Sequence, residues 1–488
     1  MKKLVRQAFI VSASRFANQG LTMISPVILV RLLSVTEFGH YREFLMYSGI
    51  LGGFAAMSLS NSLLYFLGVE PRAQWGYVRR IVIATAIASL ISVGVFGAIE
   101  LITGGRVMGS LALPLVLYVI FISNMDFWEH LWLAQHKAER ALAYTAARLL
   151  LRGITAVVAA AIGREVWTIV WALVVMEGVR CVACAVYWRR ISIGNHGEPV
   201  KASWRSQLGY SIPAGLSVAI WTLVSFMGGI FVSQMIGSAA MAFLSVGSYV
   251  LLIIPPLRNA VSDVLLPELA SRAQSVDGDW LKLWGKATVM FAILLVPLSV
   301  ILWRFAATIV TFAFSPQYAP AIPVFRIYSA IVLIAWMDIS LALRVLNQTR
   351  YMLTCVILGV FVNLGMLWFL VPRYGVVGAA ISQLGTEVFT IAFLVVCVAR
   401  IVRLPPLRLV PVRQLGKVAL ASGIALVPIY PDFWSAKFGL PGVVVAGIVF
   451  AVVYYLALDY LGVTEATKLM AAVKSKLGLG GGSAARGA

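Results

Sequence analysis

Long apolar stretches fill almost the whole chain, and this pattern leaves few folds open to it. Runs of about 20 apolar residues, the length that a membrane-spanning helix needs, recur from residue 8 to residue 462. The composition agrees, because 61% of the residues are hydrophobic and 12% are charged, against roughly 45–50% and 25% in soluble domains. The runs are continuous, whereas strands of a membrane barrel alternate in polarity. We therefore predict an all-α integral membrane protein.

The hydropathy pattern predicts about 14 transmembrane helices joined by short loops. The last two spans are the weakest, so twelve helices are the alternative count. A flexible tail rich in Lys, Gly and Ala follows at 463–488. The predicted spans are 8–33, 40–67, 78–102, 109–134, 140–162, 166–188, 207–235, 240–268, 287–312, 320–345, 351–371, 376–399, 415–431 and 438–461.

The net charge of +20 has two readings. A strongly basic soluble protein would suggest a nucleic-acid partner, but aromatic–basic nucleic-acid motifs are absent from this sequence. Most of the 39 Lys and Arg residues fall in alternate connecting segments, as the positive-inside rule requires of cytoplasmic loops. The charge distribution therefore predicts a lipid bilayer as the surroundings, both termini in the cytoplasm and no nucleic acid.

The chain also repeats itself weakly. With shifts of 202 and 212 residues, matching features fall on each other: Arg31–Tyr41 on Ser233–Phe243, Met125-Asp126 on Met337-Asp338, Gln135 on Asn347, and Gly163 on Gly375. Parallel repeats of this kind build transporters with a substrate site between the halves. The predicted domains are an N-terminal six-helix lobe at 1–190, a cytoplasmic linker at 191–206, a C-terminal six-helix lobe at 207–400, two additional helices at 401–462 and the tail.

Several arginines lie inside the predicted spans, where a charge costs at least about 2.5–3.5 kcal/mol. A guanidinium pairs with a phosphate through two hydrogen bonds, so arginines facing a wet cavity would suit an anionic substrate. Arg15 begins a polar stripe with Asn18 and Gln19 on one helix face. The alternative for Arg15 is a side chain that reaches the headgroups.

Two further arginine positions are candidates for substrate binding. Arg258 follows the double proline Pro255-Pro256, whose freed carbonyls require a cavity or a protein partner; its alternative is a structural pair with Asp263. Arg148 and Arg152 are one turn apart on one helix face. Their anions are either a substrate diphosphate or nearby carboxylates.

Acidic residues inside the spans allow either ion coupling or salt bridges. Asp126 and Glu129 share a face of the fourth span with His130, and Asp338 is the repeat-related acid in the tenth. Such groups can carry a proton or bind Na⁺ during transport, or they can pair with Arg148 and Arg152. Arg180, nearer a helix end, is expected either to reach the headgroups or to pair with Glu177.

Three stretches carry a family resemblance: Arg31-Leu32-Leu33 with Glu37-Phe38-Gly39-His40-Tyr41; Tyr210-Ser211-Ile212-Pro213 with Pro255 and Leu266–Ser271; and Arg373–Ser382 with Glu387 downstream. Over about residues 1–400 the chain resembles the polysaccharide (O-antigen, Wzx-type) flippases of the multidrug/oligosaccharidyl-lipid/polysaccharide exporter superfamily. It departs from them at Gly228 and Gly229, where many relatives carry an acid.

The resemblance implies two six-helix lobes around a central cavity, with two additional C-terminal helices. The implied substrate is an undecaprenyl-diphosphate-linked oligosaccharide, moved from the inner to the outer leaflet of the bacterial cytoplasmic membrane by alternating access. H⁺ or Na⁺ is then a candidate coupling ion, and polysaccharide polymerase machinery a candidate partner. The resemblance thus implies a transporter and not an enzyme, with alternating access in place of ATP hydrolysis. Consistently, no Walker A pattern occurs, and no cofactor or metal site is indicated.

Three alternatives stay open at this stage. The same architecture serves a flippase for the peptidoglycan precursor, and the residues do not separate the two. A cation-coupled small-molecule exporter of the same superfamily is disfavoured, because the first and seventh spans lack the acid that would attract organic cations. A membrane glycan polymerase or ligase is disfavoured, because the predicted outside loops are short and no catalytic histidine cluster occurs.

Overall fold

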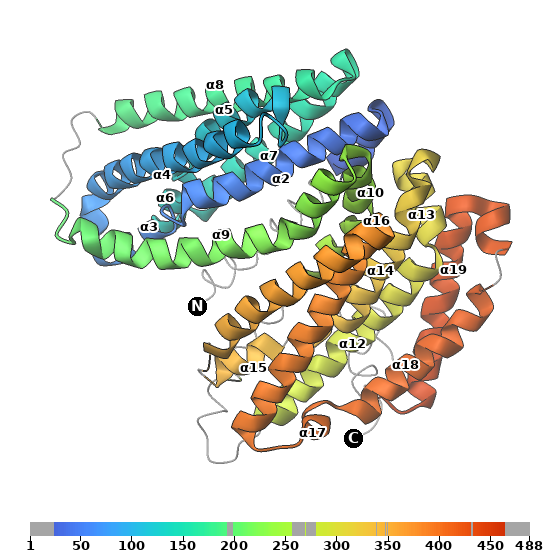
Figure 1. Ribbon diagram of the computed structural model, residues 1–488. Coiled ribbons are helices and arrows are strands. Elements are labelled where there is room, and N and C mark those ends of the chain that lie inside the picture. The colour runs from blue at the N-terminus through green and yellow to red at the C-terminus, as the bar shows by residue number, and fades with distance from the viewer. Residues whose placement is uncertain are drawn as a thin grey trace, which may run out of the picture. The chain divides into compact units, whose positions relative to one another are not determined.

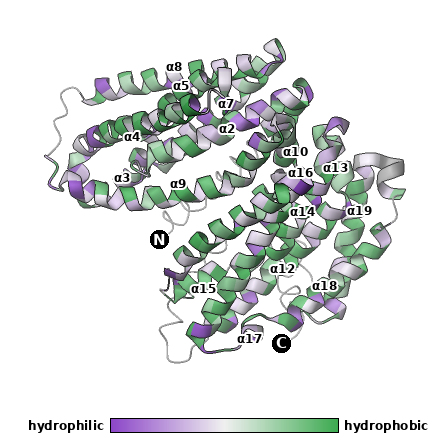
Figure 2. Cartoon of the chain, viewed as in Figure 1, coloured by the Kyte–Doolittle hydropathy of each residue, from purple (hydrophilic) through white to green (hydrophobic). Residues whose placement is uncertain are grey.

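The computed structural model describes residues 24–192, 199–255, 269, 280–337, 339–346, 348, 350–430 and 433–463. All the secondary structure within these ranges is helical, and its helices carry apolar residues over most of their length (Figures 1 and 2). Ten helical runs there are long and apolar enough to cross a membrane. The predicted all-α membrane fold is confirmed, whereas the count of fourteen, the position of the termini and the domain boundaries stay predictions.

The chain divides into two compact units, which we describe separately. The first comprises residues 1–245 with 371–379, and the second comprises 246–370 with 380–488. Helices of the first unit in chain order are α2 (Val35–Ala56), α3 (Ser62–Val69), η1 (Pro71–Ala73), α4 (Gln74–Ile102), η2 (Gly109–Leu111), α5 (Ala112–Ser123), α6 (Trp128–Ala134), α7 (Ala138–Gly163), α8 (Val166–Ser192) and α9 (Trp204–Met235).

Helix α10 (Ser238–Ser248) crosses the boundary between the units, and the second unit continues with further helices. They are η3 (Tyr249–Ile253), α12 (Trp280–Arg304), α13 (Ala306–Phe314), η4 (Pro316–Ala321), α14 (Ile322–Ile334), α15 (Ile339–Val345), α16 (Arg350–Val402), α17 (Pro406–Leu409), α18 (Val412–Leu426), η5 (Val427–Ile429) and α19 (Phe433–Tyr460). The predicted thirteenth and fourteenth spans correspond to α18 and α19, which pack on α12 through a core of small and aromatic side chains.

Several predicted spans are not single helices. The span predicted at 40–67 is interrupted between α2 and α3, where Met57 and Ser58 have positive φ angles. The span predicted at 109–134 is interrupted between α5 and α6, where Met125 has a φ of 59°. The two spans predicted at 351–371 and 376–399 are two helices that meet at a kink, because Gly375 within α16 has a non-helical φ of 58° and ψ of −133°. Helix α9 continues through Pro213.

The predicted repeat reappears in the order of the helices. In the first copy, a 3₁₀ turn leads into α5, which is interrupted before the short helix α6; in the second, η4 leads into α14, which is interrupted before the short helix α15. The next helices begin at Ala138 and Arg350, which are 212 residues apart. The backbone thus repeats the offset that aligned Met125-Asp126 with Met337-Asp338.

Carboxylates of α2 tie distant segments of the first unit together. Glu43 is 5% exposed, and it accepts hydrogen bonds from the hydroxyls of Ser233 at 2.7 Å and Ser238 at 3.1 Å. Glu37, in the first turn of α2, accepts a hydrogen bond from the backbone N–H of Val166 at the start of α8. A carboxylate at a helix N-terminus satisfies a free N–H and favours the helix dipole.

Gly39 allows the closest approach between α2 and the segment that follows α9. A β-carbon built on Gly39 would lie 1.9 Å from the carbonyl oxygen of Ser238. That oxygen belongs to the backbone, so it cannot rotate away as a side chain would. The close approach also brings Ser238 within reach of Glu43.

We predict that Gly39→Ala destabilises the protein by at least about 1–3 kcal/mol, the usual cost of overpacking, because α2 and residue 238 must separate. The matched control is Gly94→Ala in α4, where a β-carbon meets nothing within 4 Å and Ala favours the helix. Thermal unfolding of the purified variants in detergent measures the difference. Equal melting temperatures for the two variants would contradict the contact.

Candidate functional site

The interruption between α5 and α6 lies within a predicted span and leaves backbone carbonyls without helical partners, and Arg180 and Arg148 donate hydrogen bonds to them. The Arg180 guanidinium donates to the carbonyl oxygens of Phe121 at 2.6 Å and Asn124 at 3.1 Å, with longer contacts to Ile122 and Met125. Irregular backbone within a bilayer is tolerated only where protein or a wet cavity satisfies it. The interruption is therefore held by a side chain from α8.

The same arginines form an ion cluster with two carboxylates, which we define as Asp126, Arg148, Glu177 and Arg180. Arg148 Nη1 contacts Asp126 Oδ1, and Arg148 Nε lies 3.3 Å from Glu177 Oε1. Arg180 Nε contacts Glu177 Oε2, one turn away on α8. Two cations and two anions leave the cluster electrically neutral, which removes most of the cost of charge in an apolar surrounding.

Burial differs among the members of the ion cluster. The side chain of Glu177 is 0% exposed and that of Arg180 8%, whereas those of Arg148 and Asp126 are 18% and 41% exposed. The pairing alternative for Arg180 is therefore the one that occurs, and the side chain does not reach outward. Arg148 is likewise occupied by protein carboxylates and by the Ile122 carbonyl oxygen at 3.3 Å.

Glu129, on α6, forms a hydrogen bond with α7. Its carboxylate accepts a hydrogen bond of 2.8 Å from the hydroxyl of Thr145 on α7. The carboxylates of Asp126 and Glu129, predicted on one face of the fourth span, thus both meet α7. Whether either residue also takes part in ion coupling stays a prediction.

Arg152 differs from the other arginines of this region. It lies one turn beyond Arg148 on α7 and is partly exposed. Its guanidinium lies 5.5 Å from the centre of the buried Tyr118 ring, within range of a cation–π interaction. Within the described ranges it makes no salt bridge with a carboxylate. A partly exposed guanidinium held on an aromatic face retains its hydrogen-bond donors for an anionic ligand.

The remaining predicted site residues are Arg15, Asn18, Gln19, Arg258 and Asp338, and all five lie outside the described residues. Among the predicted site residues that the structure describes, Asp126 and Arg148 form an ion pair. Arg152 lies on the same helix as Arg148 but outside that pair. Within the described ranges, no group of three or more His, Cys, Asp or Glu side chains is placed to hold a metal ion.

Sequence reasoning gave Arg180 and Glu177 no functional role, although their spacing allowed a pair. The missing information was the interruption at 124–127, because only a broken helix supplies carbonyl oxygens to Arg180. Glu43 was missed altogether, since its partners Ser233 and Ser238 lie about 190 residues away. A buried carboxylate whose partners lie so far along the chain leaves no local sequence signal for such a contact.

We predict that Arg180→Gln lowers the free energy of unfolding by about 3–5 kcal/mol, because it leaves a buried carboxylate short of a partner and removes donors from the interruption. Arg189→Gln, in the exposed last turn of α8, is the matched control and should change stability by under about 0.5 kcal/mol. Chemical unfolding in detergent measures both variants. A similar loss in both would show that Arg180 has no special structural role.

Two family models match the chain. One, described as "Polysaccharide biosynthesis protein", matches residues 4–273, and the other, described as "Lipid II flippase MurJ", matches residues 198–451. The two matches overlap, and each covers more than half of the 488 residues. No curated protein matches closely enough to be counted as a relative.

Two solved structures share the fold. One is the lipid II flippase MurJ in an inward closed conformation, with a TM-score of 0.61 and 13% identity, covering 92% of this chain and 100% of that chain. The other is an inward-facing multidrug resistance MATE family transporter of the MOP superfamily, with a TM-score of 0.57 and 14% identity, covering 80% and 98%. At these identities the structural likeness shows only the fold, whereas the family models show the family. The chain belongs to the polysaccharide biosynthesis protein family of the MOP (multidrug/oligosaccharidyl-lipid/polysaccharide exporter) superfamily.

Proposed function

We propose that the protein is a flippase that moves an undecaprenyl-diphosphate-linked oligosaccharide, the repeat unit of a cell-surface polysaccharide, from the inner to the outer leaflet of the bacterial cytoplasmic membrane. The match of the polysaccharide biosynthesis model over residues 4–273 carries this proposal. The fold shared with a flippase and with an exporter supports alternating access as the mechanism.

The chemistry of the described residues is consistent with such a substrate. A diphosphate must lose much of its hydration to cross hydrocarbon, and a fixed guanidinium offsets part of that loss. Arg152 is the described arginine best suited to this task, since it is partly exposed and rests on Tyr118. Arg148, by contrast, is already neutralised by Asp126 and Glu177. We propose Arg152 as a substrate-binding residue together with Arg15, Asn18, Gln19 and Arg258.

A second candidate function is flipping of the peptidoglycan precursor. The match of the lipid II flippase model to residues 198–451 favours it, and the diphosphate chemistry asked of Arg152 is the same in both cases. A small-molecule exporter for cations is less well supported. Helix α9, the seventh span, contains neither Asp nor Glu over its whole length from Trp204 to Met235.

We predict that Arg152→Gln lowers the transport rate about ten- to hundred-fold, the effect of losing one or two charge-assisted contacts of about 1.5–3 kcal/mol. The purified variant should melt within a few degrees of the wild type, because Arg152 makes no described salt bridge and the variant loses only the contact with Tyr118. The control is Arg164→Gln, which removes an exposed cation just beyond the end of α7. Transport of a fluorescent polyprenyl-diphosphate glycolipid into proteoliposomes measures the rate. Equal rates for both variants would exclude Arg152 from substrate binding.

Depletion of the protein from its host cells tests the proposed function itself. We expect a polyprenyl-diphosphate oligosaccharide to accumulate on the cytoplasmic side, and mass spectrometry of the lipid extract gives its mass. A mass that corresponds to sugars alone supports the polysaccharide repeat, whereas sugars with an attached peptide support the peptidoglycan precursor. If neither lipid accumulated while sensitivity to toxic cations rose, the flippase proposal would be wrong.

A further inference from the structure

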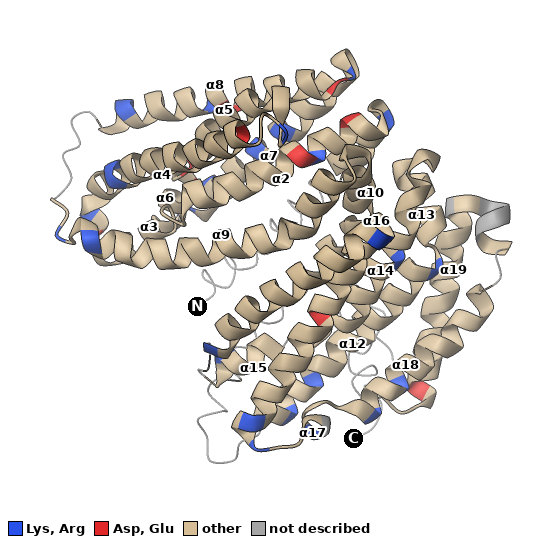
Figure 3. Cartoon of the chain, in the orientation of Figure 1, with Lys and Arg blue, Asp and Glu red and all other residues tan. Residues whose placement is uncertain are grey.

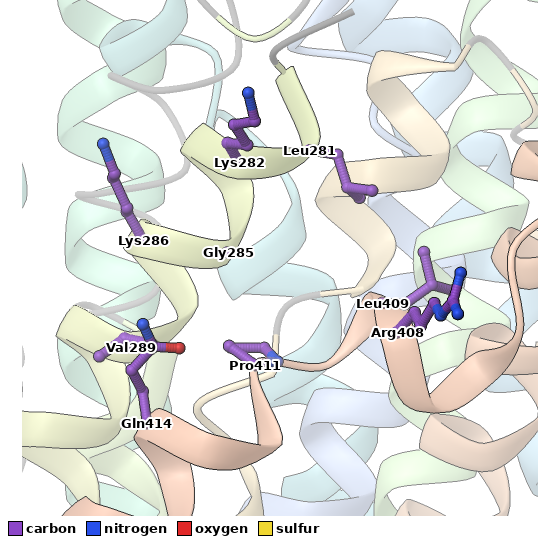
Figure 4. A pocket seen from close by; sticks show the side chains of 9 residues that line it. All are labelled: Leu281, Lys282, Gly285, Lys286, Val289, Arg408, Leu409, Pro411 and Gln414. Carbon is purple, nitrogen blue, oxygen red and sulfur yellow. The ribbon is translucent and has the colours of Figure 1, made fainter.

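A hollow in the second unit is lined by cations on an apolar wall (Figure 4). Its volume is about 340 Å³, at the small end of the range that ligand pockets occupy. It lies where the first turns of α12, the short helix α17 and the start of α18 come together. The lining residues are Leu281, Lys282, Gly285, Lys286, Val289, Arg408, Leu409, Pro411 and Gln414.

The hollow is basic on two sides. Lys282 and Lys286 are one turn apart on α12, and their side chains extend in the same direction in Figure 4. Arg408 of α17 supplies a third cation from the opposite side of the view. None of the nine lining residues is acidic. Lys286 and Arg408, on opposite sides of the hollow, create a local potential that attracts an anion.

The rest of the lining is apolar and leaves room beside the cations. Leu281, Val289, Leu409 and Pro411 contribute hydrocarbon surface. Gly285 lies between the two lysines in the α12 sequence, and a β-carbon built on it would meet nothing within 4 Å. The space next to Gly285 is therefore open, which allows a bulky ligand group to lie against the α12 backbone.

The location favours a lipid over a soluble anion. The hollow is built by the N-terminal ends of two helices that are apolar enough to span the membrane, α12 and α18. The charge pattern of the sequence predicts that these ends lie at the cytoplasmic surface, where anionic lipids attract basic side chains. An apolar wall adds nothing to the binding of free phosphate, whereas it matches the glycerol and acyl groups of a phospholipid.

We propose that this hollow is a binding site for an anionic phospholipid, whose phosphate contacts Lys286 and Arg408 and whose apolar part lies against Val289, Leu409 and the open surface at Gly285. Basic pockets between transmembrane helices on the cytoplasmic side bind anionic headgroups in this way. The lipid is a resident of the second unit and differs from any transported substrate. It fastens α12 to the α17–α18 segment by bridging cations from both.

The test is native mass spectrometry of the full-length protein in detergent, titrated with phosphatidylglycerol or with phosphatidylcholine of the same acyl chains. The wild type should bind phosphatidylglycerol preferentially. The double variant Lys286→Gln/Arg408→Gln should weaken that binding about ten- to thirty-fold, because it loses two surface cations. The variant Gly285→Phe should also weaken it, because the ring fills the hollow while every charge is kept.

Matched controls separate a built site from a general attraction to basic helix ends. Arg189→Gln/Arg190→Gln removes two exposed cations from the end of α8, and Gly447→Phe adds the same bulk to α19 at a glycine with open space. Both should bind phosphatidylglycerol like the wild type. Equal weakening in the Arg189/Arg190 control would mean diffuse charge attraction and overturn the proposal. Unchanged binding in Gly285→Phe, or displacement of the lipid by inorganic phosphate, would overturn it as well.

Discussion

The carboxylate of Glu177 lies in an apolar surrounding with no exposed surface, and the arrangement of the first unit follows from how its charge is neutralised. An unpaired ion there would cost several kcal/mol. Two guanidiniums therefore converge on Glu177, one from α7 and one from the same turn of α8. Their remaining donors must also be satisfied, and they reach the carbonyl oxygens of the interrupted fourth span. One buried acid thus fixes α7, α8 and the end of α5 together.

The same neutralisation divides the arginines of α7 between two tasks. Arg148 and Arg152 are both arginines, and they lie on nearly the same face of the same helix. The sequence alone therefore does not tell which of them would bind an anionic substrate. Arg148 forms ion pairs with Asp126 and Glu177. Arg152 instead lies over the Tyr118 ring, which attracts the cation without using its hydrogen-bond donors. Among the described residues, many of the charges lie near the helix ends (Figure 3), whereas Arg148 and Arg152 lie inside α7.

Hydropathy predicted the helical membrane fold and most spans, because a run of about 20 apolar residues has few other stable forms in any solvent. The interruptions at 57–61 and 124–127 were missed for a physical reason. A window of about 19 residues averages over a short break, and the groups that satisfy the second break come from Arg180, more than 50 residues later. The pair between Glu37 and the N–H of Val166 is equally non-local. Sequence reasoning therefore found the candidate cations but not their partners.

The two copies of the repeat also show that the ion cluster is not a requirement of the interrupted helix. Both copies contain a break after the same turn, before α6 and before α15. Yet the 212-residue offset places Val360, Phe389 and Ala392 at the positions of Arg148, Glu177 and Arg180. A valine, a phenylalanine and an alanine cannot neutralise a carboxylate or donate to a carbonyl oxygen. The second copy therefore carries no counterparts of these three charged residues at the offset positions, and its break between α14 and α15 does not depend on them.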